Sequence, residues 1–236
     1  MIKHLACIMD GNRRWARRQG QAPMLGHEEG AQAAKRAIQF CLEKKIPYLS
    51  LYTFSIENLK RSAQEKNFLF NMIATQGFQE VAQLRKHGVR IRFVGDRSLF
   101  PESLVMVCDT LERQTQDCTT LPVNLSFCYG ARQEIIGGIK KIIQQVKAGV
   151  LDENDINEES FNHYLWSHDF PEPDLIVRTG GASRLSNFLL YQAAYSELYF
   201  LDCLWPDIGA QQLEQAISFF DNAQRNFVPR VTIVIG

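Results

Sequence analysis

Six short apolar runs recur along the chain, and longer segments of helical character separate most of them. The predicted strands are 5–9, 48–54, 89–95, 122–128, 174–178 and 197–202. The predicted helices are 28–45, 62–87, 101–116, 131–148, 158–167 and 209–224. Such an alternation produces a parallel sheet with helices packed on both faces. The sequence therefore predicts an α/β fold with a central, mainly parallel six-stranded sheet flanked by helices.

The chain is expected to form one domain, residues 1–236, because no repeat or linker interrupts its 236 residues. Its formal net charge of +0 disfavours a general nucleic-acid binder, so an anion site must come from local clustering. No run approaches the ~20 apolar residues of a membrane span, and Asp10 interrupts the first run too early for a signal peptide. We expect a cytoplasmic protein, at most resting on the inner face of the membrane.

Polar residues gather just beyond the predicted strands. In open parallel sheets, ligands bind outside the carboxyl ends of the strands. The residues at these ends are Asp10, Ser55, Glu57, Asn58, Asp96, Arg132, Arg178, Gly180 and Gly181. We therefore expect one edge of the sheet to hold the chemistry.

The segment "DGNRRWARR" combines one acid with four arginines. Gly11 permits a tight turn, and Asn12 is predicted to cap a helix whose N-terminus attracts anions. The arginines spaced to share a helix face are Arg14, Arg17 and Arg18. Asp10 suits a Mg²⁺ ion that bridges a carboxylate and a diphosphate. The alternative is an ordinary acid before a solvated basic face.

Two further loops carry candidate ligands. The loop "FSIENLKR" offers a hydroxyl, an acid, an amide and two bases, although such a loop is also common on surfaces. In "RTGGASRLSNF", paired glycines admit a close ligand, and Arg178, Arg184 and Ser186 can donate to phosphate oxygens. A buried arginine is costly unless it meets an anion. Glu197 is either a second metal ligand or a surface acid.

The predicted helix 62–87 has more apolar residues than packing on a sheet requires. One face carries Leu69, Phe70, Ile73 and Val81, whereas Phe68 and Met72 lie off that face. The wide apolar surface either packs in the core or lines a cleft for a hydrocarbon. Thr53 is predicted to face that cleft or the core.

Several motifs are missing. The chain has neither a GxxxxGK[ST] loop nor a GxGxxG fingerprint, and it has no DDxxD pair. His27 lacks the neighbours of a zinc site, which leaves a phosphate donor or a helix-start residue.

The motifs "HLACIMDGNRRWA", "LYTFSIEN", "YGARQEI" and "PDLIVRTGGASRLSNFLLYQAAYSELYFLDCLWPDI" resemble the cis-prenyltransferase family, above all its bacterial undecaprenyl diphosphate synthases. The likeness runs from His4 to about Ile208, nearly the whole chain. It implies a homodimeric enzyme with a hydrophobic tunnel that opens at the carboxyl ends of the strands. Such an enzyme condenses isopentenyl diphosphate in cis onto an allylic diphosphate, such as farnesyl diphosphate, with Mg²⁺. The implied product is undecaprenyl diphosphate, the lipid-carrier precursor for cell-wall peptidoglycan, released by peripheral contact with a membrane.

The resemblance also implies roles for single residues. Asp10 and Asn58 are the expected catalytic residues, and Asp10 and Glu197 the expected metal ligands. The expected substrate-binding residues are Gly11, Asn12, Arg13, Arg14, Trp15, His27, Ser55, Ile56, Glu57, Leu59, Arg61, Arg178, Arg184, Leu185 and Ser186. The resemblance implies that the allylic diphosphate is held by Gly11, Asn12, Arg13, Arg14 and His27, and isopentenyl diphosphate by Arg61, Arg178, Arg184 and Ser186.

The chain departs from the family pattern at a few positions. Arg13 replaces a usual glycine, Pro23 an arginine, Leu59 a tryptophan and Ala182 a glutamate, and the tail lacks an Arg-x-Gly ending. These changes concern substrate preference and rate more than reaction type. Three other functions compete with this one: a non-catalytic partner subunit, an aspartate phosphatase and a nucleic-acid-binding module. The first acid and the phosphate loop are present, which disfavours a non-catalytic subunit. Asn12 stands where a phosphatase needs a second acid, and a single basic patch disfavours a nucleic-acid-binding module.

Overall fold

The computed structural model describes residues 1–223, and its strands form one sheet in the order β3-β4-β2-β1-β5-β6. The strands are β1 (His4–Ile8), β2 (Tyr48–Ser55), β3 (Val89–Val94), β4 (Leu121–Tyr129), β5 (Leu175–Arg178) and β6 (Glu197–Phe200). Every neighbouring pair is parallel, so the predicted α/β class is confirmed and the sheet is parallel throughout. The predicted tail feature, the missing Arg-x-Gly ending, lies outside the described residues.

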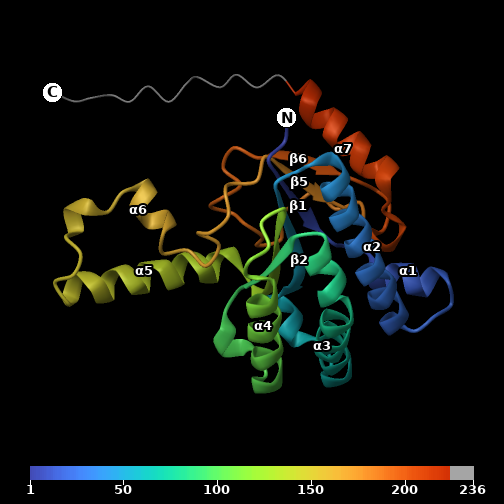
Figure 1. Cartoon of the computed structure of the whole chain (residues 1–236), viewed down its shortest axis with the longest axis horizontal. Helices are drawn as coiled ribbons and strands as arrows, with labels where there is room; N and C mark the ends of the chain where they lie inside the picture. Colours follow the sequence, from blue (N-terminus) through green and yellow to red (C-terminus); the bar gives the residue numbers. More distant parts are fainter. Residues whose placement is uncertain (224–236) are drawn as a thin grey trace.

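Helices lie on both sides of the sheet (Figure 1). They are α1 (Asn12–Arg18), α2 (Pro23–Lys44), α3 (Ala63–Lys86), α4 (Glu102–Thr115), α5 (Ala131–Lys147), α6 (Glu158–Asn162) and α7 (Ala210–Asn222). Strand side chains such as Leu51 and Ile91 pack with residues of α2, α3, α4 and α7, whereas Tyr52 and Ile176 pack with Phe188 and the start of α5. The alternation of side chains along each strand thus separates two cores.

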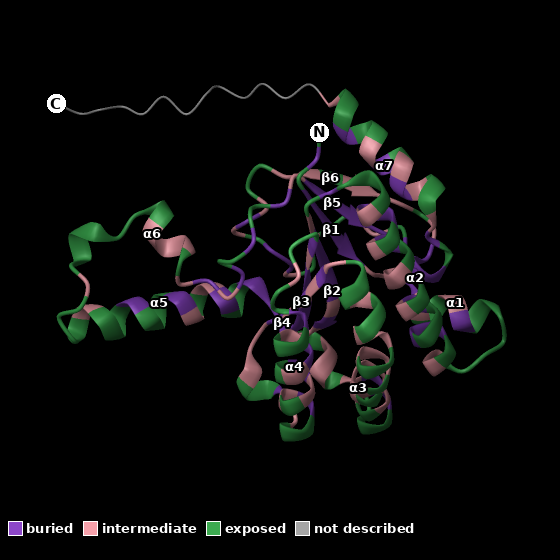
Figure 2. Cartoon of the chain, viewed as in Figure 1, coloured by how far each residue is buried: buried purple, intermediate pink, exposed green. Residues whose placement is uncertain are grey.

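The central strands are almost wholly buried (Figure 2). All five residues of β1 are buried, as expected for a parallel strand that is covered on both faces. Among the described residues, no helix is both long enough and apolar enough to cross a membrane.

One predicted helix is too long. The segment predicted as 158–167 contains only α6, which spans Glu158–Asn162. Beyond it the chain turns so that Ser167 donates through its backbone N–H and its hydroxyl to Glu134, at 2.9 and 2.8 Å. Glu134 has no exposed surface, so this turn supplies hydrogen bonds to a buried carboxylate.

Candidate active site

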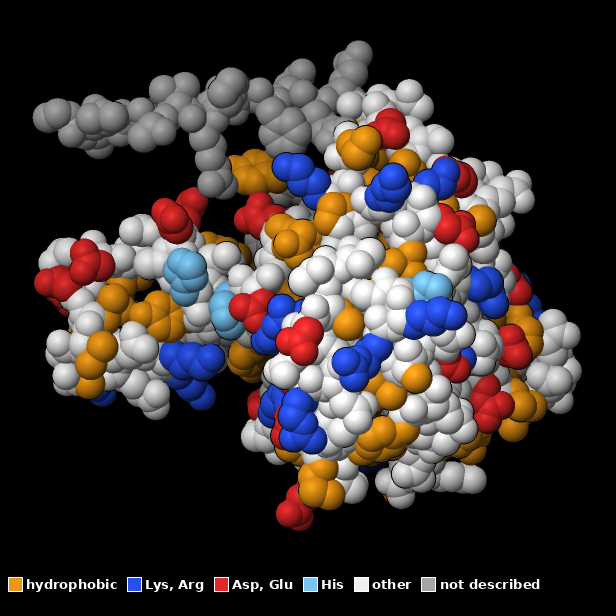
Figure 3. Space-filling view, in the orientation of Figure 1, with side chains coloured by type: hydrophobic (Ala, Val, Ile, Leu, Met, Phe, Trp, Pro, Cys, Tyr) orange, Lys and Arg blue, Asp and Glu red, His pale blue; other side chains and the backbone are white. Residues whose placement is uncertain are grey.

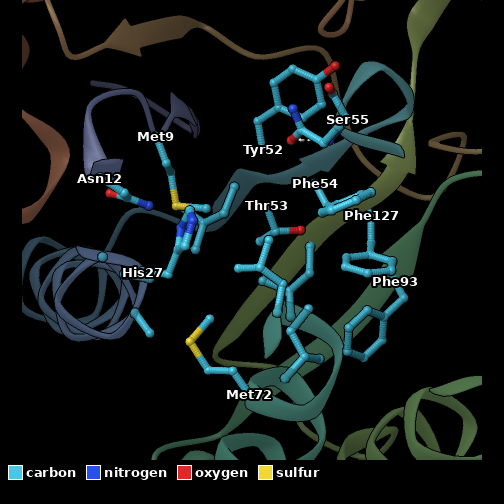
Figure 4. A pocket seen from close by; sticks show the side chains of 18 of the residues that line it. Met9, Asn12, His27, Tyr52, Thr53, Phe54, Ser55, Met72, Phe93 and Phe127 are labelled. Carbon is cyan, nitrogen blue, oxygen red and sulfur yellow. Dashed lines mark hydrogen bonds between the residues drawn. The ribbon is translucent and has the colours of Figure 1, made fainter. Parts of the chain in front are cut away.

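The carboxyl ends of β2, β1 and β5 lie next to one another, and a cavity opens beside them. Its volume is about 760 Å³. The predicted site residues that line it are Asp10, Asn12, His27, Ser55, Glu57, Asn58, Arg61, Arg178, Arg184 and Ser186. Figure 4 shows Asn12, His27 and Ser55 at its edge, with Met72 and three phenylalanines along its walls. We call the polar end the mouth and the remainder the walls, which are apolar apart from Lys35, Thr53, Gln76 and Glu80.

Asp10 is the electrostatic centre of the mouth. Its Oδ1 accepts a hydrogen bond from Arg14 at 3.0 Å, and its Oδ2 accepts one from Arg178 at 2.8 Å. Arg178 is only 3% exposed, so its charge needs this nearby anion. The expectation that a buried strand-end arginine meets an anion is met here by a carboxylate of the same chain.

The turn into α1 differs from the prediction. Gly11, not Asn12, precedes the first helical residue, and no side chain caps the helix. Gly11 has φ +119°, and a Cβ there would lie 2.8 Å from a methyl carbon of Leu204, so a side chain would be both strained and crowded. Asn12 instead lies against Gly30 of α2, and its buried Oδ1 has no hydrogen-bond donor among the described residues.

A second carboxylate, Glu65, gathers the other basic residues of the mouth. Its Oε1 lies 3.0 Å from Nε2 of His27, 3.2 Å from Nη1 of Arg61 and 3.9 Å from Nε of Arg13. Glu65 is 7% exposed. Burial lowers the pKa of His27 despite the opposing hydrogen bond to Glu65, so the imidazole is neutral at pH 7.

Sequence reasoning missed Glu65. Its backbone N–H donates to the hydroxyl of Ser62 at 3.3 Å, at the start of α3. A Ser-x-x-Glu pattern before an apolar run is the ordinary start of a helix, so the sequence gives no sign of a second role.

Two loops close the mouth. Asn58 accepts a hydrogen bond from the backbone N–H of Ser55 at 3.2 Å, which fixes the short 3₁₀ helix Ile56–Lys60. On the other side, Arg178 donates to the hydroxyl of Ser186 at 2.6 Å, and Nε of Arg184 lies 3.2 Å from the same oxygen. Asn187 joins the loops because it donates to Glu57 at 3.0 Å.

Some predicted site residues do not line the cavity. These are Gly11, Arg13, Arg14, Trp15, Ile56, Leu59, Leu185 and Glu197. Arg14 and Arg13 still contact the carboxylates of the mouth, but Trp15 donates instead to Asp207 at 2.7 Å. Leu59 and Leu185 pack against the two cores.

Glu197 lies at the amino ends of the strands, whereas Asp10 lies at their carboxyl ends, so the two side chains are too far apart to hold one metal ion within a single chain. It is the first residue of β6 and pairs with Leu175, which pairs with Leu5 of β1. It is therefore level with Leu5, roughly 16 Å along the strand direction from Asp10. A parallel sheet separates residues that begin a strand from those that follow one.

The walls are built mainly by aliphatic and aromatic side chains from α3 and the sheet. Those from α3 are Leu69, Met72, Ile73, Val81 and Leu84. Met72, which periodicity placed off the apolar face, is therefore a wall residue, because the cavity lies beside α3 rather than only beneath it. Thr53 lines the cavity as well and donates to the carbonyl of Ser126 at 2.8 Å.

Comparisons with known proteins bear on this site. The family model described as "Putative undecaprenyl diphosphate synthase" matches residues 8–228. The chain belongs to this family. The isoprenyl transferase of Clostridium perfringens (strain 13 / Type A) is 42% identical over 227 residues, 96% of this chain and 90% of the relative. The ditrans,polycis-undecaprenyl-diphosphate synthase ((2E,6E)-farnesyl-diphosphate specific) of Escherichia coli (strain K12) is 41% identical over 225 residues, 95% and 89% respectively.

Solved structures of the undecaprenyl diphosphate synthase family and its relatives share the fold. Lavandulyl diphosphate synthase from Lavandula x intermedia, in complex with dimethylallyl diphosphate, has a TM-score of 0.91 and 31% identity over 95% of this chain and 97% of that chain. A "probable undecaprenyl diphosphate synthase" from Campylobacter jejuni has a TM-score of 0.79 and 34% identity over 96% and 98%. The predicted cis-prenyltransferase resemblance is confirmed, which places the chain among prenyltransferases rather than phosphatases.

The family resemblance implies Mg²⁺, and the mouth fits one way of holding it. Within residues 1–223 there is no group of three or more His, Cys, Asp or Glu side chains that would hold a metal ion. Mg²⁺ is often bound by one or two carboxylates together with substrate phosphates. Asp10, whose side chain is 31% exposed at the mouth, fits an ion shared with a bound diphosphate.

Proposed function

We propose that this chain is a cis-prenyltransferase that adds isopentenyl diphosphate units to an allylic diphosphate, with farnesyl diphosphate as the first primer. The observation that carries the proposal is one continuous cavity with arginines at its mouth and hydrocarbon-like walls. Diphosphates suit the mouth, and a prenyl chain suits the walls. The names of the bacterial relatives support the same reaction and an undecaprenyl product.

The basic side chains of the mouth have two tasks in this reaction. We assign the diphosphate of the isopentenyl unit to Arg178, Arg184 and Ser186, which line the cavity. We assign the allylic diphosphate to Asn12, which also lines it, and to Arg14, which contacts Asp10 beside it. Donors fixed around a leaving group stabilise the charge that develops as its bond breaks. Bound Mg²⁺ would add charge neutralisation at the same oxygens. The newly added isopentenyl unit must then lose a proton, and we propose that Asn58, with Ser55 on the same loop, assists its removal.

The walls give the growing chain a dry site. Leu51, Phe54, Phe93 and Phe127 all line the cavity. An apolar enclosure binds hydrocarbon and keeps water from a reactive allylic cation. A reaction that joined only two five-carbon units would leave most of this volume unused, so the cavity favours a long product.

We also propose that the enzyme is a homodimer that touches a membrane when it releases product. The projection formed by α5 and α6 exposes hydrophobic side chains (Figure 3). Ile136, Ile139 and Ile143 of α5 are 51%, 40% and 47% exposed, at spacings that place them on one side of the helix. A second copy would bury them. Light scattering coupled to size exclusion tests the homodimer, and a monomeric mass at micromolar concentration would contradict it.

The activity test uses purified protein with farnesyl diphosphate, labelled isopentenyl diphosphate, Mg²⁺ and detergent. We expect label in a butanol-soluble, chain-extended product, and we expect Asp10→Ala to abolish it. No incorporation by the unmodified protein would overturn the proposal, as would full incorporation by Asp10→Ala. Chromatography of the dephosphorylated product then distinguishes an undecaprenyl chain from a shorter one.

A further inference from the structure

The main chain of Asp10 is held by one hydroxyl on both of its polar groups. The backbone N–H of Asp10 is shared between Oγ1 of Thr179 at 3.1 Å and the carbonyl of Ile8 at 3.0 Å, and the Thr179 hydroxyl donates to the carbonyl of Asp10 at 2.8 Å. A hydroxyl has one proton and two lone pairs, so it can make both bonds at once. Thr179 has no exposed surface. The arrangement is therefore shielded from competing water.

We call the two bonds between Thr179 Oγ1 and the main chain of Asp10 the clamp. The clamp joins the two chain segments just beyond the last paired residues of β1 and β5. The ladder between β1 and β5 ends where Ile8 pairs with Arg178. The residues after β5 turn away from β1, because Gly180 and Gly181 have φ of +86° and +70°. The side chain of Thr179 supplies bonds that a longer ladder would have supplied. Beside the clamp, the backbone N–H of Trp205 donates to the carbonyl of Asp10 at 3.0 Å.

The side chain of Asp10 is held differently, by Arg14 and Arg178. In the proposed function, on which this inference rests, these arginines turn to diphosphate oxygens when substrate binds. The carboxylate then loses its own anchors at the moment its position matters for the reaction. The backbone bonds to Thr179 and Trp205 do not involve substrate-binding side chains, so they remain.

We propose that Thr179 is a positioning residue, which keeps the Asp10 carboxylate aimed into the mouth when Arg14 and Arg178 are engaged by substrate. It does not touch the reacting atoms itself. Misplacement of a reacting group by about 1 Å can reduce a rate on the order of 10²-fold. Loss of the clamp should therefore reduce kcat while the arginines still bind diphosphate.

The test compares Thr179→Val, which keeps the shape but removes the hydroxyl, with Thr179→Ser, which keeps it. Thr115→Val is the matched control, since Thr115 is equally buried and its hydroxyl accepts from Ile91 at 3.0 Å and donates to the carbonyl of Leu111 at 2.9 Å. For Thr179→Val we expect kcat to fall about tenfold to a hundredfold, with KM for both diphosphates within about threefold. The Mg²⁺ concentration for half-maximal rate should rise at least about threefold, because a misaimed carboxylate binds the shared ion less well.

A second measurement does not depend on turnover. In Thr179→Val the N–H of Asp10 keeps only the carbonyl of Ile8, and its own carbonyl keeps only Trp205. Amide hydrogen exchange of the peptide that contains Asp10 should therefore accelerate in Thr179→Val, but not in Thr179→Ser or Thr115→Val. The proposal is overturned if kcat and the Mg²⁺ requirement of Thr179→Val match those of Thr115→Val, or if exchange at Asp10 is unchanged. Failure of the unmodified protein to make product would refute the proposed function instead, and the exchange result would still test the clamp.

Discussion

The mouth and the walls of the cavity are built from opposite kinds of side chain, and they are held in place by different forces. In the mouth, ion pairs join residues far apart in the chain, such as Asp10 with Arg178 at 2.8 Å. In the walls, rings and aliphatic groups pack, as Phe54 and Phe127 do with centroids 5.1 Å apart. Directional bonds are sensitive to single atoms, whereas packing is sensitive to volume. The mouth should therefore govern rate, and the walls should govern product length.

The largest effect is expected in the mouth, from Arg178→Met. The substitution leaves Asp10 with Arg14 alone and removes a donor for diphosphate, so we expect kcat/KM for isopentenyl diphosphate to fall on the order of 10²–10³-fold. Steady-state kinetics with labelled substrate measure it. The control is Arg92→Met on β3, which breaks the 2.6 Å ion pair between Arg92 and Asp169; Arg92 does not line the cavity. A loss below about tenfold, or an equal loss in the control, would show that Arg178 serves the fold only.

The walls should respond in product length, and Gly77→Ala tests this. A Cβ at Gly77 of α3 would lie 2.5 Å from Cδ1 of Leu111, so the leucine must move, and both residues line the cavity. We expect shorter products, with the rate of the first condensation within about threefold, because the mouth is unchanged. Gly137→Ala is the control, since its Cβ would meet only Trp166 at 3.6 Å. An unchanged product distribution would mean that this part of the wall does not limit elongation.

How far sequence reasoning reached also differs between the two regions. The strands were predictable from their apolar runs, and Asp10 and Arg178 were predictable at the carboxyl ends of two of them. For Asp10 the sequence alone still allowed an ordinary acid before a solvated basic face. Thr179 and Glu65 were not, because a threonine after a strand and a glutamate in a first helical turn are ordinary residues there. Periodicity misplaced Met72, since it describes one helix face and not a cavity beside it. Glu197 could be placed only once the direction of β6 was known, because it begins that strand and so lies at the end of the sheet away from the mouth.

A smaller effect concerns stability and the two buried histidines, His27 in the mouth and His4 in β1. Burial lowers the pKa of His4 to about 4, and it lowers the pKa of His27 as well. Both side chains are neutral when folded and bind a proton more readily when unfolded. Their contribution to stability is therefore complete above about pH 6.5 and decreases as pH falls below it; for His4 it is lost as pH falls toward 4.

For His4 alone, linkage predicts a loss of about 1 kcal/mol in the free energy of unfolding between pH 7 and pH 5.5. Urea unfolding at both values measures it. His4→Asn should remove this part of the pH dependence, whereas His87→Asn, at an exposed position, should not. The same slope in His4→Asn as in the unmodified protein would contradict the assignment to His4.

The smallest effect is expected from Arg13→Gln, at the outer limit of the mouth. Arg13 is 55% exposed and its Nε lies 3.9 Å from Glu65, so the pair should add little to stability. A second positive charge near the allylic diphosphate should still aid its capture, and we expect KM for farnesyl diphosphate to rise about threefold with kcat unchanged. Arg17→Gln is the control, because Arg17 is an exposed arginine of the same helix with no ion pair within residues 1–223. Equal changes in the two variants would attribute the effect to the net charge of α1, whereas a change confined to Arg13→Gln would support a direct role of Arg13 in capturing the allylic diphosphate.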